Sequence, residues 1–227
     1  MDDPDDLGAG RWEHQRPPLL LPVPAAEAGP LAGRRVVIHD PECGVWRYDL
    51  RALSEPYRGS ECDVVLLCSE HDWYRAQRED TLVTAGWPAD LDDVWIEQPV
   101  PDAGTATQPD QSDIPLDAGR ARRLVDDLTR PPVRRLRPAT GAAALVGARA
   151  VVLTPTGPRW DQRVIGNPRR ATYPPEVLNL TRGFDSLGEP VIGTVVPVCS
   201  ENEYYAWEQL GEFPEPVHHA TTLVWLE

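Results

Sequence analysis

One stretch of sequence occurs twice in this chain. Residues 68–75 read Cys-Ser-Glu-His-Asp-Trp-Tyr-Arg, and residues 199–206 read Cys-Ser-Glu-Asn-Glu-Tyr-Tyr-Ala. Each stretch is followed downstream by a Val-Trp-aliphatic-Glu segment, at 94–97 and at 224–227. Because ordered matches at a nearly constant offset rarely arise by chance, the sequence predicts an internal duplication.

The match extends upstream of these stretches. An Arg-Pro-Pro tripeptide, a glycine and a tryptophan recur at one constant offset. In the two copies these are 16–18 and 130–132, Gly33 and Gly147, and Trp46 and Trp160. The second copy carries additional residues around 169–190, whose prolines and glycines are typical of a long loop.

The duplication divides the chain into four parts. We expect a disordered acidic tail at 1–15, a first repeat domain at 16–97, a linker at 98–129 and a second repeat domain at 130–227. Within the linker, arginines and aspartates at helical spacing favour a short helix over Asp117–Thr129.

Within each copy the pattern predicts three strands, a short helix and a final strand. The third strand is expected at Cys62–Cys68 and at Val191–Cys199, where β-branched and aliphatic residues dominate. Ser69 and Ser200 are each followed three residues later by an acidic residue, the spacing of a capping box at a helix start. Gly211 is suited to end the second helix in the left-handed region.

This order of elements predicts the α+β class, as two tandem diverged copies of a small β-rich domain. One short helix cannot cover a flat sheet. We therefore expect the sheet to curl into a partly open, SH3-like barrel, or to hold its helix over one face. Tandem copies can pack as a fused pseudo-dimer, and the sequence leaves open whether these two touch.

Charge and composition exclude several classes of function. The formal net charge is −14 and the isoelectric point is about 4.7, which disfavours a nucleic-acid binder because phosphate contacts need basic residues. All 22 basic residues are arginine, so Schiff-base lysines and phosphate-loop lysines are absent. No apolar run is long enough to span a membrane, and the acidic first residues do not resemble a secretory signal. The expected location is cytoplasmic.

Three pairs of aromatic residues are the candidate binding residues. They recur in both copies and are Trp46 and Trp160, Tyr74 and Tyr205, and Trp95 and Trp225. Tyrosine and tryptophan dominate binding hot spots, so the pairs could form a shared recognition surface. Large aromatic residues on strands also pack in cores, and the sequence does not decide between these two interpretations.

Cysteine and histidine residues give no convincing catalytic or metal site. Cys68 and Cys199 precede a helix start, which can activate a thiol, but His71 of the first copy is replaced by Asn202 in the second. We therefore expect both thiols to be buried. A zinc site would draw on Cys43, Cys62, Cys68, His71 and His39. Their spacing lacks the two close ligand pairs of structural zinc sites, so neither a metal nor a cofactor is predicted. His218 and His219 are expected in a loop.

The leading functional hypothesis is a non-enzymatic binding or regulatory adaptor that engages the basic surface of a protein partner. The basic segment from residue 120 to residue 137 is first interpreted as a solvated helix and linker. It could instead dock on an acidic surface, including one of this chain's own domains, or touch nucleic acid, although Asp126 and Asp127 dilute its charge. One alternative is an enzyme with its active site between the repeats, in which carboxylates act with His39 or His71. Another is a structural subunit of a larger assembly. The sequence identifies no catalytic residue and no oligomeric state.

Overall fold

The computed structural model describes residues 18–40, 42–100, 130–140, 142, 145–154, 157–173 and 191–227. The chain divides into two compact units. We call Pro18–Arg134 the N unit, and the unit that includes Arg135–Glu227 the C unit. The expected acidic tail, the linker helix and residues 174–190 of the expected loop lie outside the described residues.

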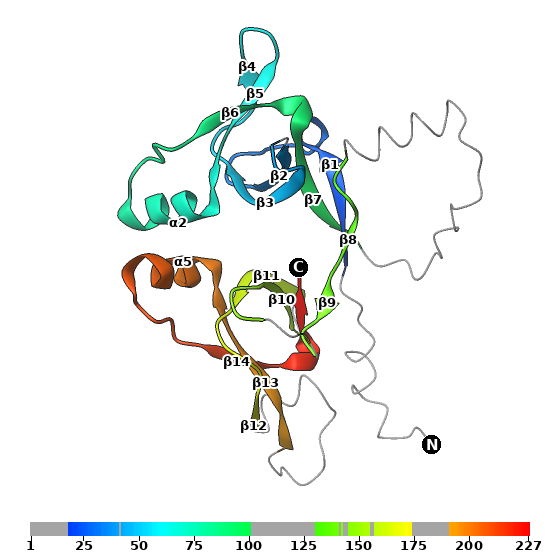
Figure 1. Ribbon diagram of the computed structural model, residues 1–227, viewed down its shortest axis with the longest axis vertical. Helices are drawn as coiled ribbons and strands as arrows, with labels where there is room; N and C mark the ends of the chain where they lie inside the picture. The colour runs from blue at the N-terminus through cyan, green and yellow to red at the C-terminus, as the bar shows by residue number, and fades with distance from the viewer. Residues whose placement is uncertain are drawn as a thin grey trace, which may run out of the picture. The chain divides into compact units, whose positions relative to one another are not determined.

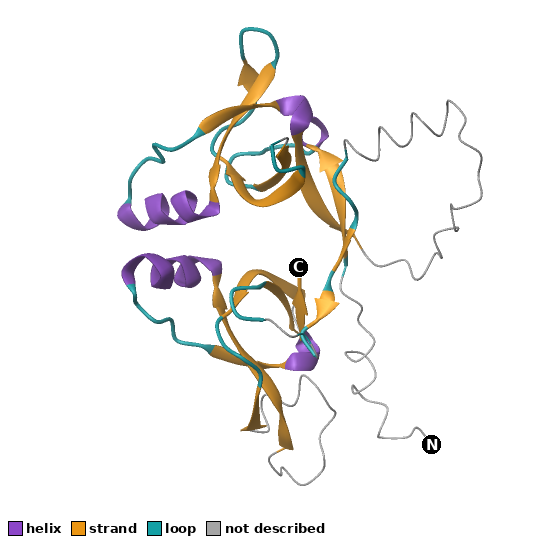
Figure 2. Cartoon of the chain, viewed as in Figure 1, coloured by secondary structure: helices purple, strands orange, loops and turns teal. Residues whose placement is uncertain are grey.

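The N unit contains one sheet and one helix (Figures 1 and 2). Its strands are β1 (Leu19–Pro24), β2 (Arg35–Asp40), β3 (Val45–Ala52), β4 (Tyr57–Arg58), β5 (Asp63–Ser69), β6 (Trp87–Asp90), β7 (Val94–Val100) and, at the unit boundary, β8 (Arg134–Arg135). The helix is α2 (Glu70–Glu79), and 3-10 turns lie at Ala25–Glu27 and Leu91–Asp93.

The described part of the C unit repeats this order from its second strand onward. Its strands are β9 (Arg137–Pro138), β10 (Arg149–Thr154), β11 (Gly157–Val164), β12 (Arg169–Tyr173), β13 (Val191–Ser200), β14 (Val217–Ala220) and β15 (Val224–Leu226). The helix is α5 (Glu201–Leu210), and a 3-10 turn lies at Thr221–Leu223. Two β-rich sheets, each with one described helix, agree with the predicted α+β class.

Strand pairing follows the same path in both units. In the N unit β2 pairs with β3, β3 with β5 and β5 with β6, while β7 returns to pair with β2. In the C unit the corresponding path is β10, β11, β13 and β14, and β15 returns to β10. All these pairs are antiparallel, and a three-residue 3-10 turn joins β6 to β7 and β14 to β15. Each path therefore returns to its first strand, and a 3-10 turn connects its last two strands, β6 and β7 or β14 and β15.

Alternate residues of these strands fill the core of each unit. In the N unit the core includes Val65 and Leu67 of β5 and Val94 and Ile96 of β7. Because successive strand side chains point to opposite faces, the residues between them lie on the other face of the sheet. In the C unit the same strand positions are again apolar: Val196, Val198, Val224 and Leu226.

The predicted helix starts are confirmed in both units. Ser69 and Ser200 have extended backbones, and their hydroxyl groups accept from the backbone N–H groups of Asp72 and Glu203. The longer Glu203 side chain reaches back to the Ser200 N–H and completes the capping box, which satisfies two otherwise unpaired donors. The predicted end of the second helix is also confirmed, because Gly211 lies there at a φ of 75°.

Two expectations for the second copy were wrong. Arg169–Tyr173, expected in a long loop, forms β12 and pairs with β13. Arg169 lies opposite Val195 as Tyr57 of β4 lies opposite Val64, so β12 lengthens a hairpin that both units have. The predicted correspondence between Trp46 of the first copy and Trp160 of the second was also wrong. Strand register places Trp160 at the position of Tyr48, because the turn between β10 and β11 is two residues shorter than that between β2 and β3.

Within the described ranges, no helix has the length and apolar character needed to cross a membrane.

Candidate functional site

A buried carboxylate lies at the start of the N unit's helix. Glu70, the first residue of α2, is completely buried. It accepts a hydrogen bond from Nε of Arg35 at 3.0 Å, and Nε of Arg51 lies 3.7 Å from the same oxygen. Arg51 also donates to the carbonyl oxygen of Gly33 at 3.0 Å and to the hydroxyl group of Tyr74 at 2.7 Å.

The C unit has the same arrangement at its helix start. Glu201 accepts from Nε of Arg149 at 2.8 Å, and Nε of Arg163 lies 3.2 Å from that oxygen. Arg163 donates to the carbonyl oxygen of Gly147 at 2.9 Å and to the hydroxyl group of Tyr205 at 3.0 Å.

These buried ion pairs hold each helix on its sheet. A buried charge is costly unless it is paired and hydrogen-bonded, and here each glutamate meets two guanidinium groups. The partners come from the two strands next to the helix start, β2 and β3 in the N unit. The bonds therefore fix where the helix leaves the sheet. Glu70 and Glu201 were not among the candidate residues predicted from the sequence, although the repeated Cys-Ser-Glu motif contains both.

Tyr74 and Tyr205, two of the candidate binding residues, belong to these networks. Each hydroxyl group meets an arginine, and each ring lies beside that arginine's guanidinium carbon, at 5.2 Å for Tyr74 and 5.5 Å for Tyr205. Tyr74 is half-buried, and Tyr205 is buried. Both side chains therefore position an arginine within their own unit.

Trp95 and Trp225 lie on the sheet face opposite the cores that contain Val94 and Val224. Trp95 is half-buried, and the guanidinium carbon of Arg130 lies 5.8 Å from its ring centre. Trp225 packs against a small apolar cluster that includes Leu153. Neither ring is presented as a fully exposed surface.

Trp46 and Trp160 lie at the β2–β3 and β10–β11 hairpins. Trp46 is half-buried and meets the His39 ring edge-on at 5.1 Å. Trp160 is also half-buried and lies where the β10–β11 register shifts, and its carbonyl oxygen accepts from the Gln162 side chain. The six candidate aromatics thus take part in separate local contacts.

The predicted burial of Cys68 and Cys199 is confirmed. Burial, with a smaller effect from nearby acidic residues, raises the pKa of the Cys68 thiol to about 11 and that of Cys199 to about 12. Both therefore stay protonated at neutral pH. His218 and His219, expected in a loop, lie in β14 instead. Among the residues that the structure describes, no group of three or more His, Cys, Asp or Glu side chains could hold a metal ion.

Part of the basic segment docks on the N unit, as one sequence-based alternative allowed. Arg130 donates to the carbonyl oxygen of Pro22 at 3.0 Å. Arg134 pairs with the carboxylate of Glu97, and its guanidinium carbon lies 4.2 Å from the ring centre of Tyr48. These two arginines therefore cover aromatic surface on the side of β7 that carries Trp95.

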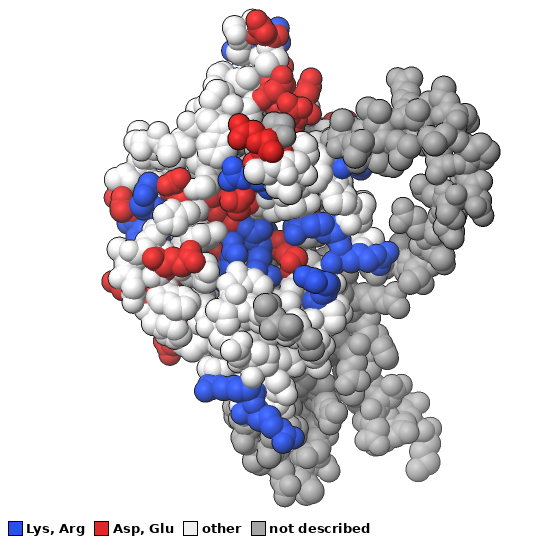
Figure 3. All heavy atoms as spheres, in the orientation of Figure 1, with Lys and Arg blue, Asp and Glu red and all other residues white. Residues whose placement is uncertain are grey.

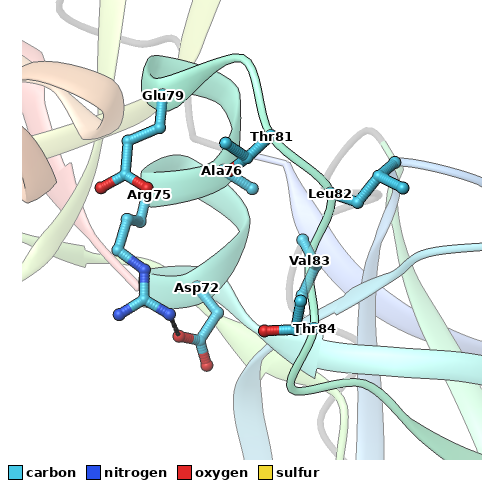
Figure 4. Close-up of a pocket in the computed structure, with 8 residues that line it drawn as sticks. All are labelled: Asp72, Arg75, Ala76, Glu79, Thr81, Leu82, Val83 and Thr84. Carbon is cyan, nitrogen blue, oxygen red and sulfur yellow. Dashed lines mark hydrogen bonds and ion pairs between the residues drawn. The ribbon is translucent and has the colours of Figure 1, made fainter.

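A hollow opens beside the N unit's helix. Its volume is about 360 Å³, and it lies between α2 and the segment that follows it. The lining residues are Asp72, Arg75, Ala76, Glu79, Thr81, Leu82, Val83 and Thr84. Figure 4 shows Asp72 and Ala76 on the side of α2 that faces this segment, with Val83 and Thr84 across from them. Leu82 turns outward and is 89% exposed.

The C unit carries two aromatic rings at the corresponding positions. Ala76 and Trp207 are both the seventh residue of their helices. Leu82 and Phe213 both lie two residues beyond the left-handed residue that ends the helix, Asp80 or Gly211. Trp207 meets Phe213 edge-on with ring centres 5.0 Å apart. The C unit therefore has a pair of aromatic rings in contact where the N unit has Ala76 and Leu82.

The two units also differ in charge. Over the described residues the N unit carries 15 acidic and 9 basic side chains, whereas the C unit carries 7 of each. Figure 3 shows acidic atoms gathered over the end of the N unit that carries β4, β5 and the 3-10 turn before β7. Several exposed acids lie there, among them Glu61, Asp92 and Asp93. The N unit therefore accounts for much of the acidic character of the described chain.

No family model, no curated protein and no solved structure matches this chain. Its function is therefore inferred from the residues of the chain themselves.

The hollow was not predicted from the sequence. It depends on the small side chain of Ala76, and a search for conspicuous residues overlooks a small one. The repeat alignment contains a usable signal, because Ala76 and Trp207 share the offset that relates Cys68 to Cys199.

Proposed function

We propose that the protein is a non-enzymatic adaptor that binds a protein partner through its N unit. The hollow beside α2 carries this proposal. Its volume of about 360 Å³ lies within the range of ligand-binding pockets, and its lining combines the apolar side chains of Ala76, Leu82 and Val83 with two threonines and with charged residues of α2. The corresponding position of the C unit is taken up by Trp207 and Phe213.

Charge supports the choice of a basic partner. The surplus of six carboxylates on the described N unit, 15 acidic against 9 basic side chains, would attract a positively charged surface and hasten the encounter. Salt would weaken the contacts with such a partner, because the acidic side chains involved are exposed to solvent.

The same proposal treats the two units as diverged copies of one domain. The support is a set of equivalent bonds: the buried glutamate, its two arginines and the tyrosine occur in both units at matching positions. The strand path that returns to its start, with a 3-10 turn across the gap, favours a partly open, SH3-like barrel. We place the protein in the cytoplasm because its four cysteines are all free, as is usual in a reducing compartment.

A comparative capture experiment tests the proposal. Tagged full-length protein is incubated with lysate of its native cell at low and high salt, beside two variants. One variant neutralises the N unit (Glu61→Gln, Asp92→Asn, Asp93→Asn), and the matched control neutralises exposed acids of the C unit (Glu212→Gln, Glu215→Gln).

We expect one protein to be retained in stoichiometric amount by the parent chain and by the control, and to be lost at high salt and with the N-unit variant. Absence of any stoichiometric partner at either salt concentration would contradict the proposal, as would equal capture by both variants.

A further inference from the structure

We propose that the hollow beside α2 holds an aromatic side chain of the partner, flanked in the partner's sequence by arginine or lysine. This inference deepens the proposed function and rests on it, because it names the chemistry of the segment that the N unit would bind.

The C unit shows what fits such a site. Its helix has the same length as α2, begins with the same Ser cap and ends in the same left-handed conformation. The indole of Trp207 projects from the position of Ala76 and meets a second ring from the following segment. The N unit keeps the backbone that builds this site but supplies only a methyl group, so a ring from another chain can take the place of the indole.

The walls of the hollow suit an aromatic guest. Ala76 lies on the helix side of the hollow and is 7% exposed, while Thr81, Val83 and Thr84 line it from the segment that follows α2. A ring in this open hollow would lose water from the face turned toward Ala76 and Val83, and burial of aromatic surface is a major source of binding free energy. Leu82 stands at the outer edge and offers further apolar surface to the guest's neighbours.

Charges around the hollow determine what should flank the ring. Asp72 is already paired with Arg75 at 2.7 Å. Glu79 and Asp80, at the end of α2, are both exposed carboxylates. A basic residue next to the inserted ring would meet these two groups, whereas an acidic residue would be repelled. The C unit has Leu210 and Gly211 at the two corresponding positions.

Three capped tripeptides serve as probes: Arg-Trp-Arg, Arg-Ala-Arg and Glu-Trp-Glu, each acetylated and amidated. Each is titrated into the isotope-labelled full chain while backbone amide NMR signals are followed. We expect Arg-Trp-Arg to shift the signals of residues 76–84 in a saturable way. The other two peptides should bind at least about tenfold more weakly, a difference of about 1.4 kcal/mol.

Two variants locate the site. Ala76→Trp supplies the residue that the C unit has and should abolish the shifts. Thr84→Arg changes an exposed residue at the rim, so it should weaken binding at least about tenfold without a change in melting temperature. Thr140→Arg, the same change at an exposed threonine of the C unit, is the matched control and should bind like the parent.

Several outcomes would overturn the inference. They are an absence of saturable shifts at 76–84, equal binding by Ala76→Trp, and equal binding of Glu-Trp-Glu. The lysate capture distinguishes this failure from failure of the proposed function. If Ala76→Trp still retains the partner, the adaptor function stands and the hollow is not its site, whereas loss of a stoichiometric partner from the parent chain removes both.

Discussion

The two units hold their helices in the same way and differ on the surface that the helix presents. Glu70 and Glu201 are both buried and both meet two arginines from the adjacent strands. Beside the helix, however, Ala76 leaves a hollow where Trp207 contacts Phe213. The comparison shows that buried, hydrogen-bonded groups are kept where they determine the position of an element, while the position of Ala76 and Trp207, on another side of the same helix, varies.

The charged residues of the two units also agree where they are buried and differ where they are exposed. The arginines and glutamates of the two buried networks correspond one to one, yet the exposed residues give the described N unit 15 acidic against 9 basic side chains and the described C unit 7 of each. Exposed charges have small effects on stability and large effects on association. The difference in charge is what the proposed binding role of the N unit requires.

The buried networks offer the largest test of this comparison. Glu201→Gln removes the charge that compensates Arg149 and Arg163, whose side chains are 9% and 13% exposed. We expect the C unit to lose about 3 kcal/mol or more, because the variant removes the carboxylate charge that both buried guanidinium groups share, while the longer contact of Arg149 with Glu227, at 3.6 Å, remains. Glu70→Gln should cost the N unit less, since one of its two contacts is longer, at 3.7 Å.

Amide hydrogen exchange in urea measures each unit separately, since one free energy of unfolding does not describe a two-unit chain. Glu215→Gln, at an exposed position, is the control and should change stability by less than about 0.5 kcal/mol. A similarly small change for Glu201→Gln would show that the network does not hold the helix.

Acid should affect the C unit more than the N unit. Burial, together with the nearby charges of Arg159 and His218, lowers the pKa of His219 to about 4. The His219 imidazole takes up a proton below about pH 6.5 in the unfolded chain, but only near pH 4 in the folded unit. The free energy of unfolding of the C unit is therefore unaffected by His219 above pH 6.5. It falls as the pH falls toward 4, by about 2 kcal/mol at pH 5.

Strand register places Ala89 of β6 opposite Val65, as His219 lies opposite Val196. The N unit thus lacks this titration, and His219→Ala should flatten the pH dependence of C-unit exchange between pH 6.5 and 4. An unchanged dependence in that variant would assign the acid sensitivity to other groups.

Two glycines allow a finer comparison. Gly33 and Gly147 have φ values of 82° and 84°, in the region that disfavours other residues. Alanine at either position should cost about 1–2 kcal/mol. The cost should be larger for Gly147→Ala, because the new Cβ would lie 3.2 Å from the Tyr204 hydroxyl, against 3.6 Å from the Trp73 ring at Gly33.

Gly29→Ala is the control for backbone strain alone. Gly29 also has a positive φ of 74°, but no atom lies within 4 Å of the position that an alanine Cβ would take there. Thermal unfolding of the three variants ranks the costs. If Gly147→Ala were the mildest of the three, the proposed close packing of Tyr204 on the turn would be incorrect.

The helix caps provide the smallest expected effect. Ser200→Ala and Ser69→Ala should each cost about 1 kcal/mol, because each removes the acceptor for a backbone N–H group of the first turn. Ser200→Ala should cost slightly less, because the bond from the backbone N–H of residue 200 to Glu203, which completes the capping box only in the C unit, does not need the serine side chain and remains. Exchange rates of the first-turn amides measure this difference, and equal rates in the two variants would show that the second bond adds nothing.

Local signals in the sequence predicted much of the fold. The caps at Ser69 and Ser200 and the left-handed Gly211 depend on neighbouring residues, so spacing alone identified them. Strand β12 was missed because its pairing with β13 joins segments that are distant in sequence. Strand β1 was missed as well, since Pro22 and Pro24 argue against a strand, although Leu19–Pro24 pairs along β7.

The candidate site was harder to predict for two physical reasons. Aromatic residues attract attention as binding groups, but Tyr74 and Tyr205 bind arginines of their own units. The hollow instead arises from the small size of Ala76, and its depth depends on where the segment after α2 lies. Such a feature becomes visible only when the two units are compared position by position.

The most direct test of the account is a double exchange, in which Ala76→Trp and Trp207→Ala are combined in one chain and titrated with the Arg-Trp-Arg peptide. We expect the peptide-induced amide shifts to disappear from residues 76–84 and to appear around Phe213, more weakly because the C unit lacks the carboxylates of Glu79 and Asp80. Shifts that remain at 76–84, or that never appear near Phe213 in a chain with parental stability, would contradict it.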